Sequence, residues 1–116
     1  MSNVNEQLKM TGRLRIHLNG ELVRDIDNLV VTAGKGFVAT RMIGTGTGVM
    51  THMGVGTGTT DPAAGDTALE TQVGSRIAFT TSAAVSAAVV TYITAFAAGE
   101  GTGALTEAGI FNASSG

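Results

Sequence analysis

The groups that could do chemistry are concentrated in one stretch, Met50–Leu69, with the sequence MTHMGVGTGTTDPAAGDTAL. A glycine-rich loop after a strand can cradle a phosphate with its backbone N–H groups. A Walker A loop also needs a lysine followed by serine or threonine, and neither GVGTGTTD nor GTGTGVM at residues 44–50 supplies that lysine. A dinucleotide-binding fingerprint needs a helix directly after the glycines, whereas DPAAGD predicts a turn. The sequence therefore disfavours a phosphate site in this loop.

A second candidate is a metal or acid–base cluster made of His52, Asp61 and Asp66. Their spacing defines no geometry, and a single histidine on a strand is more often a hydrogen-bonded structural residue than a ligand or base. Asp61-Pro62 indicates a turn in which the carboxylate accepts backbone donors, and Asp66 could cap a short helical turn. The serines lie outside any G-x-S-x-G motif. We therefore expect no catalytic, cofactor-binding or metal-binding residues and a protein that is not an enzyme.

The overall composition narrows the class of protein further. The chain has 116 residues, enough for one domain, with 14% charged residues and a formal net charge of -2. This balance argues against a nucleic-acid partner, and the absence of cysteine excludes disulfides and thiolate metal sites. Seventeen glycines with few aromatic residues are typical of an all-β protein with a thin core. We expect such a chain to associate as a homo-oligomer or to dock on a larger surface.

The chain also shows little sign of a membrane-targeting segment. Residues 83–98 are apolar, but the run is too short for a transmembrane helix and Ser86, Thr91, Tyr92 and Thr94 interrupt it. The polar start MSNVNEQLK argues against a standard signal peptide. We therefore expect no membrane partner.

The clearest strand begins at Gly12, where apolar and polar residues alternate strictly up to Leu18. Asn19-Gly20 predicts a turn, and residues 21–26 return as the second strand. A two-residue turn would place Arg15 opposite Arg24, which is unfavourable. A three-residue loop of Leu18, Asn19 and Gly20 instead places Arg13 opposite Asp25 and Ile16 opposite Leu22. We therefore favour the three-residue loop.

The rest of the chain predicts further short strands and one helix. The helix is expected over Ala33–Ile43, with Gly44 as its stop. Strands are expected at residues 29–32, 49–56, 75–81, 89–96 and 105–113, with a bulge at Gly109 and a turn region at residues 82–88. The cationic side chains should form a solvated, locally paired surface: Arg13, Arg15, Arg24, Lys35, Arg41 and Arg76. The fold class is mainly β: a single-domain, jelly-roll-like antiparallel β-sandwich at residues 11–116 with one short helix, preceded by an extended arm at residues 1–10.

Three runs carry a resemblance to a known family: residues 5–42, HMGVGTGTTDPAAGDTALETQVGSR at 52–76, and VVTYITAFAAGEGTGALTEAGIFNAS at 89–114. In them the chain resembles small virion proteins of tailed bacteriophages, which are described as structural, capsid decoration (cement) or fibre-like proteins. The resemblance implies an all-β fold of jelly-roll type and no catalytic residues. Members of that family continue with a further strand pair past the counterpart of Ser115-Gly116.

The resemblance leads to a specific expectation about function. We expect a capsid cement protein that binds the major capsid protein on the outer shell of the virion, after assembly in the host cytoplasm, and that bridges neighbouring capsomers. Residues 1–10 and the glycine loops are the expected contacts. The alternative is a tail, baseplate or fibre-associated adaptor. A small ligand-binding or enzymatic domain is a third class, which would bind nucleotide or metal in calorimetry.

Overall fold

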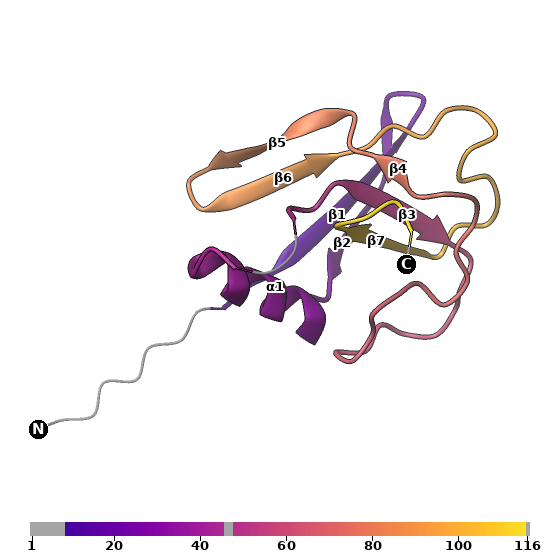
Figure 1. Ribbon diagram of the computed structural model, residues 1–116. Coiled ribbons are helices and arrows are strands. Elements are labelled where there is room, and N and C mark those ends of the chain that lie inside the picture. Colours follow the sequence, from indigo (N-terminus) through magenta and orange to yellow (C-terminus); the bar gives the residue numbers. More distant parts are fainter. Residues whose placement is uncertain (1–8, 46–47, 116) are drawn as a thin grey trace, which may run out of the picture.

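The chain folds mainly into antiparallel β-structure with one short helix, as the sequence predicts (Figure 1). The computed structural model describes residues 9–45 and 48–115. Its elements are β1 (Gly12–Leu18), β2 (Glu21–Asn28), α1 (Thr32–Met42), β3 (His52–Gly56), β4 (Ile77–Ala78), β5 (Thr81–Ser86), β6 (Val89–Ile93) and β7 (Glu107–Phe111). They form three sheets, ordered β1-β2, β4-β3-β7 and β5-β6. The finer expectation of a jelly-roll-like sandwich stays a prediction, and most of the expected arm, residues 1–8, lies outside the described residues.

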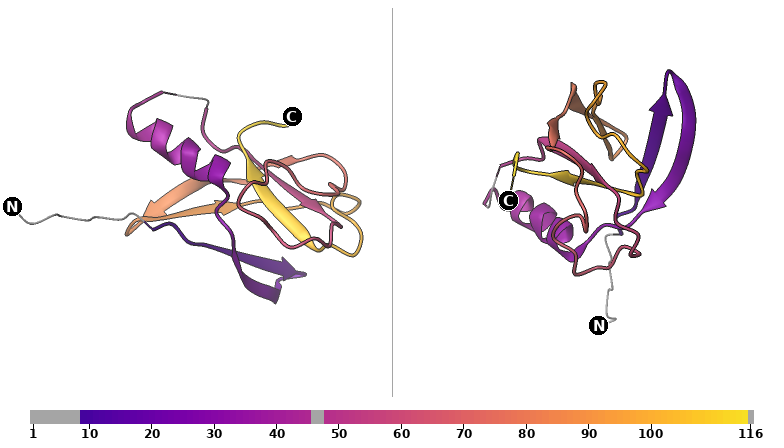
Figure 2. Two further views of the ribbon diagram at one scale, coloured as in Figure 1. Left: turned by 90° about the horizontal axis from the view of Figure 1, so that it is seen from below. Right: turned by 90° about the vertical axis from the view of Figure 1, so that its right-hand side faces the viewer.

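The three-stranded sheet lies in the middle of the molecule, with the β1-β2 hairpin on one side and α1 on the other (Figure 2). Its register runs from His52 opposite Phe111 to Gly56 opposite Glu107. Gly54 faces Gly109 within this ladder, so the bulge predicted at Gly109 is wrong. The glycine pair leaves space for the Phe111 ring, which lies 3.2–3.3 Å from where a β-carbon would stand on either residue. Glycine therefore serves close packing here rather than a break in the strand.

The β1-β2 hairpin corrects the predicted loop. Leu18 pairs with Glu21, so the turn consists of Asn19 and Gly20 alone, both at positive φ (52° and 81°). These angles are those of a type I′ turn, which suits the twist of the flanking strands. The like-charge clash that argued against this turn does not arise, because the register shifts between Ile16 and His17. The bulge places Arg15 opposite Asp25 rather than opposite an arginine.

The β5-β6 hairpin corrects a second prediction. Residues 81–86 form a strand where the sequence predicts a turn region, and only Ala87 and Ala88 turn the chain. Both alanines have positive φ (49° and 66°), a conformation for which sequence rules expect glycine or asparagine. Side chains alternate in the strand that follows, since Tyr92 is half-buried whereas Ile93 is exposed.

Helix α1 begins and ends within one residue of its predicted bounds. The strand predicted just before it, at residues 29–32, is wrong: Leu29 is exposed and Thr32 already belongs to the helix. The Thr32 N–H donates to the Ala64 carbonyl at 2.7 Å, which ties the start of α1 to the loop after β3. No residue of α1 is buried. The described ranges contain no helix with the length and hydrophobicity that crossing a bilayer requires.

The remaining strands are shorter than predicted. The segment at residues 75–81 keeps only the pair Ile77–Ala78, and the strand predicted at 89–96 ends at Ile93. The chain beyond these ends makes single links instead, such as the Phe79 N–H to the Thr51 carbonyl at 3.0 Å. Because so many segments are irregular, little side-chain surface is enclosed. Val55 in β3 is the one large apolar side chain that is buried among the described residues, at 7% exposure.

Candidate interaction surface

Of the three residues considered as a metal or acid–base cluster, His52 and Asp66 have separate local roles. His52 lies in β3, where its Nδ1 is 2.7 Å from the Thr51 hydroxyl oxygen. Asp66 accepts a hydrogen bond from the Ala63 N–H at 2.9 Å and closes a turn there, without a helix. Within residues 9–45 and 48–115, no three histidine or carboxylate side chains come together in a way that could hold a metal ion. The geometry therefore gives this cluster no support.

The glycine–threonine loop after β3 is organised by a carboxylate that the sequence reasoning missed. Glu107, at the start of β7, accepts hydrogen bonds from three backbone N–H groups: Gly58 at 2.6 Å, Glu70 at 2.7 Å and Thr71 at 2.8 Å. Thr106 adds its hydroxyl, which donates to the Gly58 carbonyl at 2.5 Å. Charge-assisted bonds of this kind are the stronger class of hydrogen bond. Glu107 thus joins the loop to a strand that lies 49 residues further along the chain.

This contact also explains why the loop resembles a phosphate cradle in sequence. The backbone donors that an anion would need are present, but the protein's own carboxylate occupies those of Gly58 and Thr71. The neighbouring Thr59 N–H donates to Glu70 at 3.1 Å. The pKa of Glu70 is lowered, chiefly because the Thr60 hydroxyl donates a hydrogen bond to its carboxylate. The loop is therefore a closed structural joint rather than an open anion site.

Two buried glycines make this joint possible. A β-carbon on Gly56 would overlap the Thr71 carbonyl oxygen, and one on Gly58 would overlap the Glu107 carboxylate. The Thr57 N–H donates to the same Thr71 carbonyl at 2.9 Å. The only signal for this joint in the sequence is a glutamate at the edge of the apolar run LTEAGIF.

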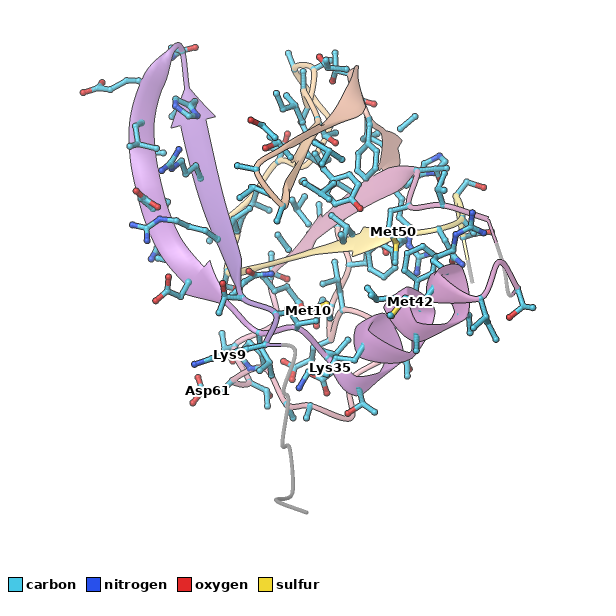
Figure 3. The ribbon with its side chains drawn as sticks, turned by 90° about the vertical axis from the view of Figure 1, so that its left-hand side faces the viewer. Lys9, Met10, Lys35, Met42, Met50 and Asp61 are labelled. Carbon is cyan, nitrogen blue, oxygen red and sulfur yellow. The ribbon has the colours of Figure 1, made fainter. Side chains whose placement is uncertain are left out.

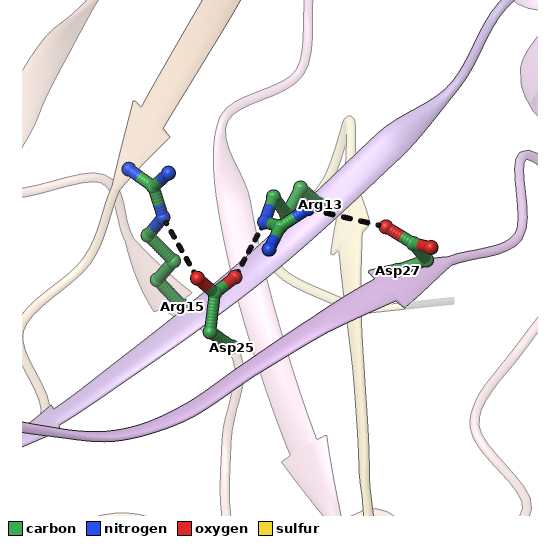
Figure 4. A network of polar contacts seen from close by, with 4 residues as sticks. All are labelled: Arg13, Arg15, Asp25 and Asp27. Carbon is green, nitrogen blue, oxygen red and sulfur yellow. Dashed lines mark hydrogen bonds and ion pairs between the residues drawn. The ribbon is translucent and has the colours of Figure 1, made fainter.

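The prediction of locally paired cations is confirmed for Arg13 and Arg15 in the hairpin (Figure 4). Arg13 donates from Nε to Asp25 at 2.5 Å and lies 3.5 Å from Asp27, while Arg15 lies 3.6 Å from Asp25. The hydrogen bond from Arg13 lowers the pKa of Asp25. The charges on this face therefore compensate one another within the hairpin and leave no basic patch.

Arg76 is also engaged, although its partner is an aromatic ring. Its guanidinium carbon lies 3.6 Å from the centre of the Phe111 ring, a cation–π arrangement. Its Nη1 donates to the Ala113 carbonyl at 3.3 Å. The open depression beside it is lined by Leu69 and by small and polar residues of segments 68–76 and 114–115. Arg76 thus anchors the C-terminal segment against β7.

The most unusual property of the molecule is the apolar surface that it leaves uncovered. Thirteen large apolar side chains in the described residues are exposed. Most belong to the two hairpins and to the end of α1: Leu18, Leu22, Val23, Ile26, Leu29, Met42, Ile43, Val49, Val85, Val89, Val90, Ile93 and Ile110. Single exposed apolar residues are ordinary, but so many exposed large apolar side chains beside one buried one among the described residues is the pattern of an interaction surface.

The total surface supports the same conclusion. The accessible area is 8624 Å², whereas a compact monomer of 11.7 kDa is expected to expose about 5,900 Å². Residues outside the described ranges account for at most about 1,600 Å² of the difference, which leaves an excess of about 1,100 Å² or more. Each partner in a stable protein–protein interface contributes about 800 Å². The surplus is therefore of the size that a partner would cover.

No family model, curated protein or solved structure matches this chain.

Proposed function

We propose that this chain is a non-enzymatic virion structural protein of a tailed bacteriophage, namely a capsid cement protein that binds the outer shell and stabilises contacts between capsomers. The observation that carries the proposal is the uncovered apolar surface, with only Val55 enclosed among the described large apolar side chains. A protein with such a surface is suited to permanent association rather than to a free existence in solution.

The arrangement of the sequence motifs supports the same proposal. Two segments within the runs that carry the resemblance, GTGTT at residues 56–60 and TEAGIFNA at 106–113, lie far apart in the chain. In the structure they meet, because Glu107 of the second run binds the Gly58 N–H of the first. The shared motif therefore corresponds to one structural joint. A joint of this kind preserves the shape of a surface rather than the geometry of a reaction.

The mechanism is stabilisation by mass action. A protein that binds only the assembled shell raises the free energy of disassembly by its binding free energy at every occupied site. The major capsid protein is the partner in this proposal, and the finer architecture proposed for residues 11–116 is a single-domain, jelly-roll-like antiparallel β-sandwich. The site of action is the capsid surface of the virion.

The proposed contacts are residues 1–10 and the glycine loops, of which residues 1–8 and 46–47 lie outside the described residues. Figure 3 shows Lys9 and Met10 at the end of the molecule where α1 begins, near Lys35 and Asp61. Asp61 belongs to the exposed part of the loop that follows β3. Segments 9–10 and 59–66 are the described parts of these proposed contacts, and their backbone can add to a neighbouring sheet.

The test is to replace residues 2–10 with a glycine–serine linker of equal length and to measure occupancy on purified capsids. We expect lower occupancy and shells that disassemble at a lower temperature than those carrying the wild type. The control variant Glu21→Gln changes an exposed side chain in β2, outside the proposed contacts, and should keep full occupancy. Undiminished binding of the linker variant would remove the arm from the mechanism.

Copy number distinguishes the alternative, a tail, baseplate or fibre-associated adaptor. Labelled protein spread over the whole shell in electron micrographs supports the cement role. Label confined to one vertex or to the tail supports the adaptor.

A further inference from the structure

Strand β6 has an unpaired edge, and its chemistry goes beyond the proposed function. The β5-β6 hairpin closes at the pair Ser86 and Val89, so the Val89 backbone groups point toward β5. Successive residues alternate, and Val90 and Tyr92 therefore direct their N–H and C=O groups away from β5. In the described part of the chain these groups have no hydrogen-bond partner, and the sheet ends at β6.

The surface around this edge has an unusual composition. No charged residue occurs between Arg76 and Glu100. Val89, Val90 and Ile93 in β6 are 61%, 48% and 52% exposed. Natural proteins usually protect an open edge with charges, proline or a covering element, and β6 carries neither a charge nor a proline. An open, uncharged strand of this kind is built to pair with another strand.

We propose that β6 pairs with β6 of a second copy of this chain, antiparallel about a two-fold axis midway between the two Thr91 residues. A two-fold axis perpendicular to a sheet maps each face onto itself, so it must lie midway between two copies of the same residue. With the axis in this position, Val90 of each copy lies opposite Tyr92 of the other, and the outward-pointing groups form four hydrogen bonds. Val89 then lies opposite Ile93, and Thr91 lies opposite its own equivalent. All three pairings are of favourable cross-strand types.

Alternative pairings fit less well. Moving the axis by one residue along β6 pairs the strand with residues 88 or 94, which lie outside it. Strand β2 also ends its sheet, but an axis through its centre would place Arg24 opposite Arg24 or Asp25 opposite Asp25. Like charges directly opposite each other destabilise a strand pair. Of these two edges, β6 is therefore the one that complements itself.

The test is sedimentation velocity on the purified full chain, and the wild type is expected to be a dimer. T91K and T91E should each weaken dimerisation on the order of tenfold, because each places like charges opposite one another across the axis. Mixing T91K with T91E should restore association as a heterodimer. V90P should also weaken dimerisation, because it removes two of the four intermolecular donors while the groups that face β5 remain. T102K, at an exposed position outside every strand, is the matched control and should behave as the wild type.

Several outcomes overturn the inference. They are a wild type that remains monomeric at about 100 μM, a trimer, variants at Thr91 that dimerise like T102K, or a T91K and T91E mixture no tighter than either alone. Circular dichroism of each variant shows whether it is folded, and the charge-swap rescue distinguishes a lost contact from a lost fold. Capsid occupancy is a separate measurement, so failure here leaves the proposed cement role standing, and the reverse also holds.

Discussion

Removing the Glu107 carboxylate should loosen the joint that connects the glycine–threonine loop to β7. The side chain accepts three backbone N–H bonds, two at Oε2 from Gly58 and Thr71 and one at Oε1 from Glu70. In Glu107→Gln the amide oxygen can retain the two bonds at one position. The amide nitrogen then faces the Glu70 N–H, so two donors oppose each other. Glu107→Ala removes all three acceptors at once.

The magnitudes follow from the number of bonds. A hydrogen bond to a charged group contributes about 1.5–3 kcal/mol net, and the lower end applies where water can reach the partners. Two of the three bonds to Glu107 are exposed and one is partly buried. We therefore expect Glu107→Gln to lower the free energy of unfolding by about 1–2 kcal/mol and Glu107→Ala by about 3–4 kcal/mol.

The assay is urea unfolding at one fixed protein concentration, because association with a second copy changes apparent stability. Hydrogen exchange should show faster exchange at the Gly58, Glu70 and Thr71 amides. The control is Glu21→Gln, at an exposed carboxylate next to the hairpin turn, which should change the free energy of unfolding by less than about 0.5 kcal/mol. If both Glu107 variants stay within that range and the three amides exchange as in the wild type, the joint does not hold the loop.

Three further outcomes are expected. Asp25 has a lowered pKa because Arg13 donates a hydrogen bond to it. Its contribution to stability is therefore complete above the unfolded pKa of about 3.9 and is lost as the pH falls through the lower folded pKa. Arg13→Gln should raise the pKa of Asp25 in an NMR titration, and an unchanged value would contradict the ion pair. Thr94 has a buried hydroxyl with no hydrogen-bond partner in the described residues. Thr94→Val should therefore raise the free energy of unfolding by up to about 1 kcal/mol. A loss of stability in urea would instead indicate that the hydroxyl has a partner. Gly58→Ala should lower the free energy of unfolding by about 1–3 kcal/mol, because the added carbon meets Glu107 and Glu70. Gly65→Ala, in open space, should change it by less than about 0.5 kcal/mol. Equal urea midpoints for the two variants would refute the close packing at Gly58.

The β1-β2 hairpin shows how far sequence reasoning reaches. The alternation from Gly12 to Leu18 and the Asn19-Gly20 turn signal located both strands correctly. The opposing charges favour a three-residue loop only if the register is uninterrupted, and the structure shows that it is not. A bulge near Ile16 resolves the conflict and gives Arg15 an aspartate as its partner. Bulges have no strong local sequence signal. The charges therefore indicate that Arg15 avoids Arg24, but they do not show that a bulge separates the two.

The loop after β3 likewise has one property that the sequence predicts and one that it does not. The loss of phosphate chemistry from the loop after β3 could be argued from the missing lysine alone. The contact that replaces it could not, because Glu107 lies 49 residues from Gly58 and nothing local indicates that they meet. The positive-φ alanines at 87 and 88 were equally hidden, since alanine is a poor signal for a type I′ turn.

What the sequence determined by itself is the class of structure: mainly β, one short helix after residue 31, hairpin pairing and charges neutralised nearby. These features depend on neighbouring residues, whose alternation, turn chemistry and spacing are written locally in the chain. The tertiary structure alone decided which distant segments meet, where the glycines allow close approach, and how little of the apolar surface is enclosed. Such features depend on contacts between segments far apart in the chain, and local patterns carry no information about their register or distance.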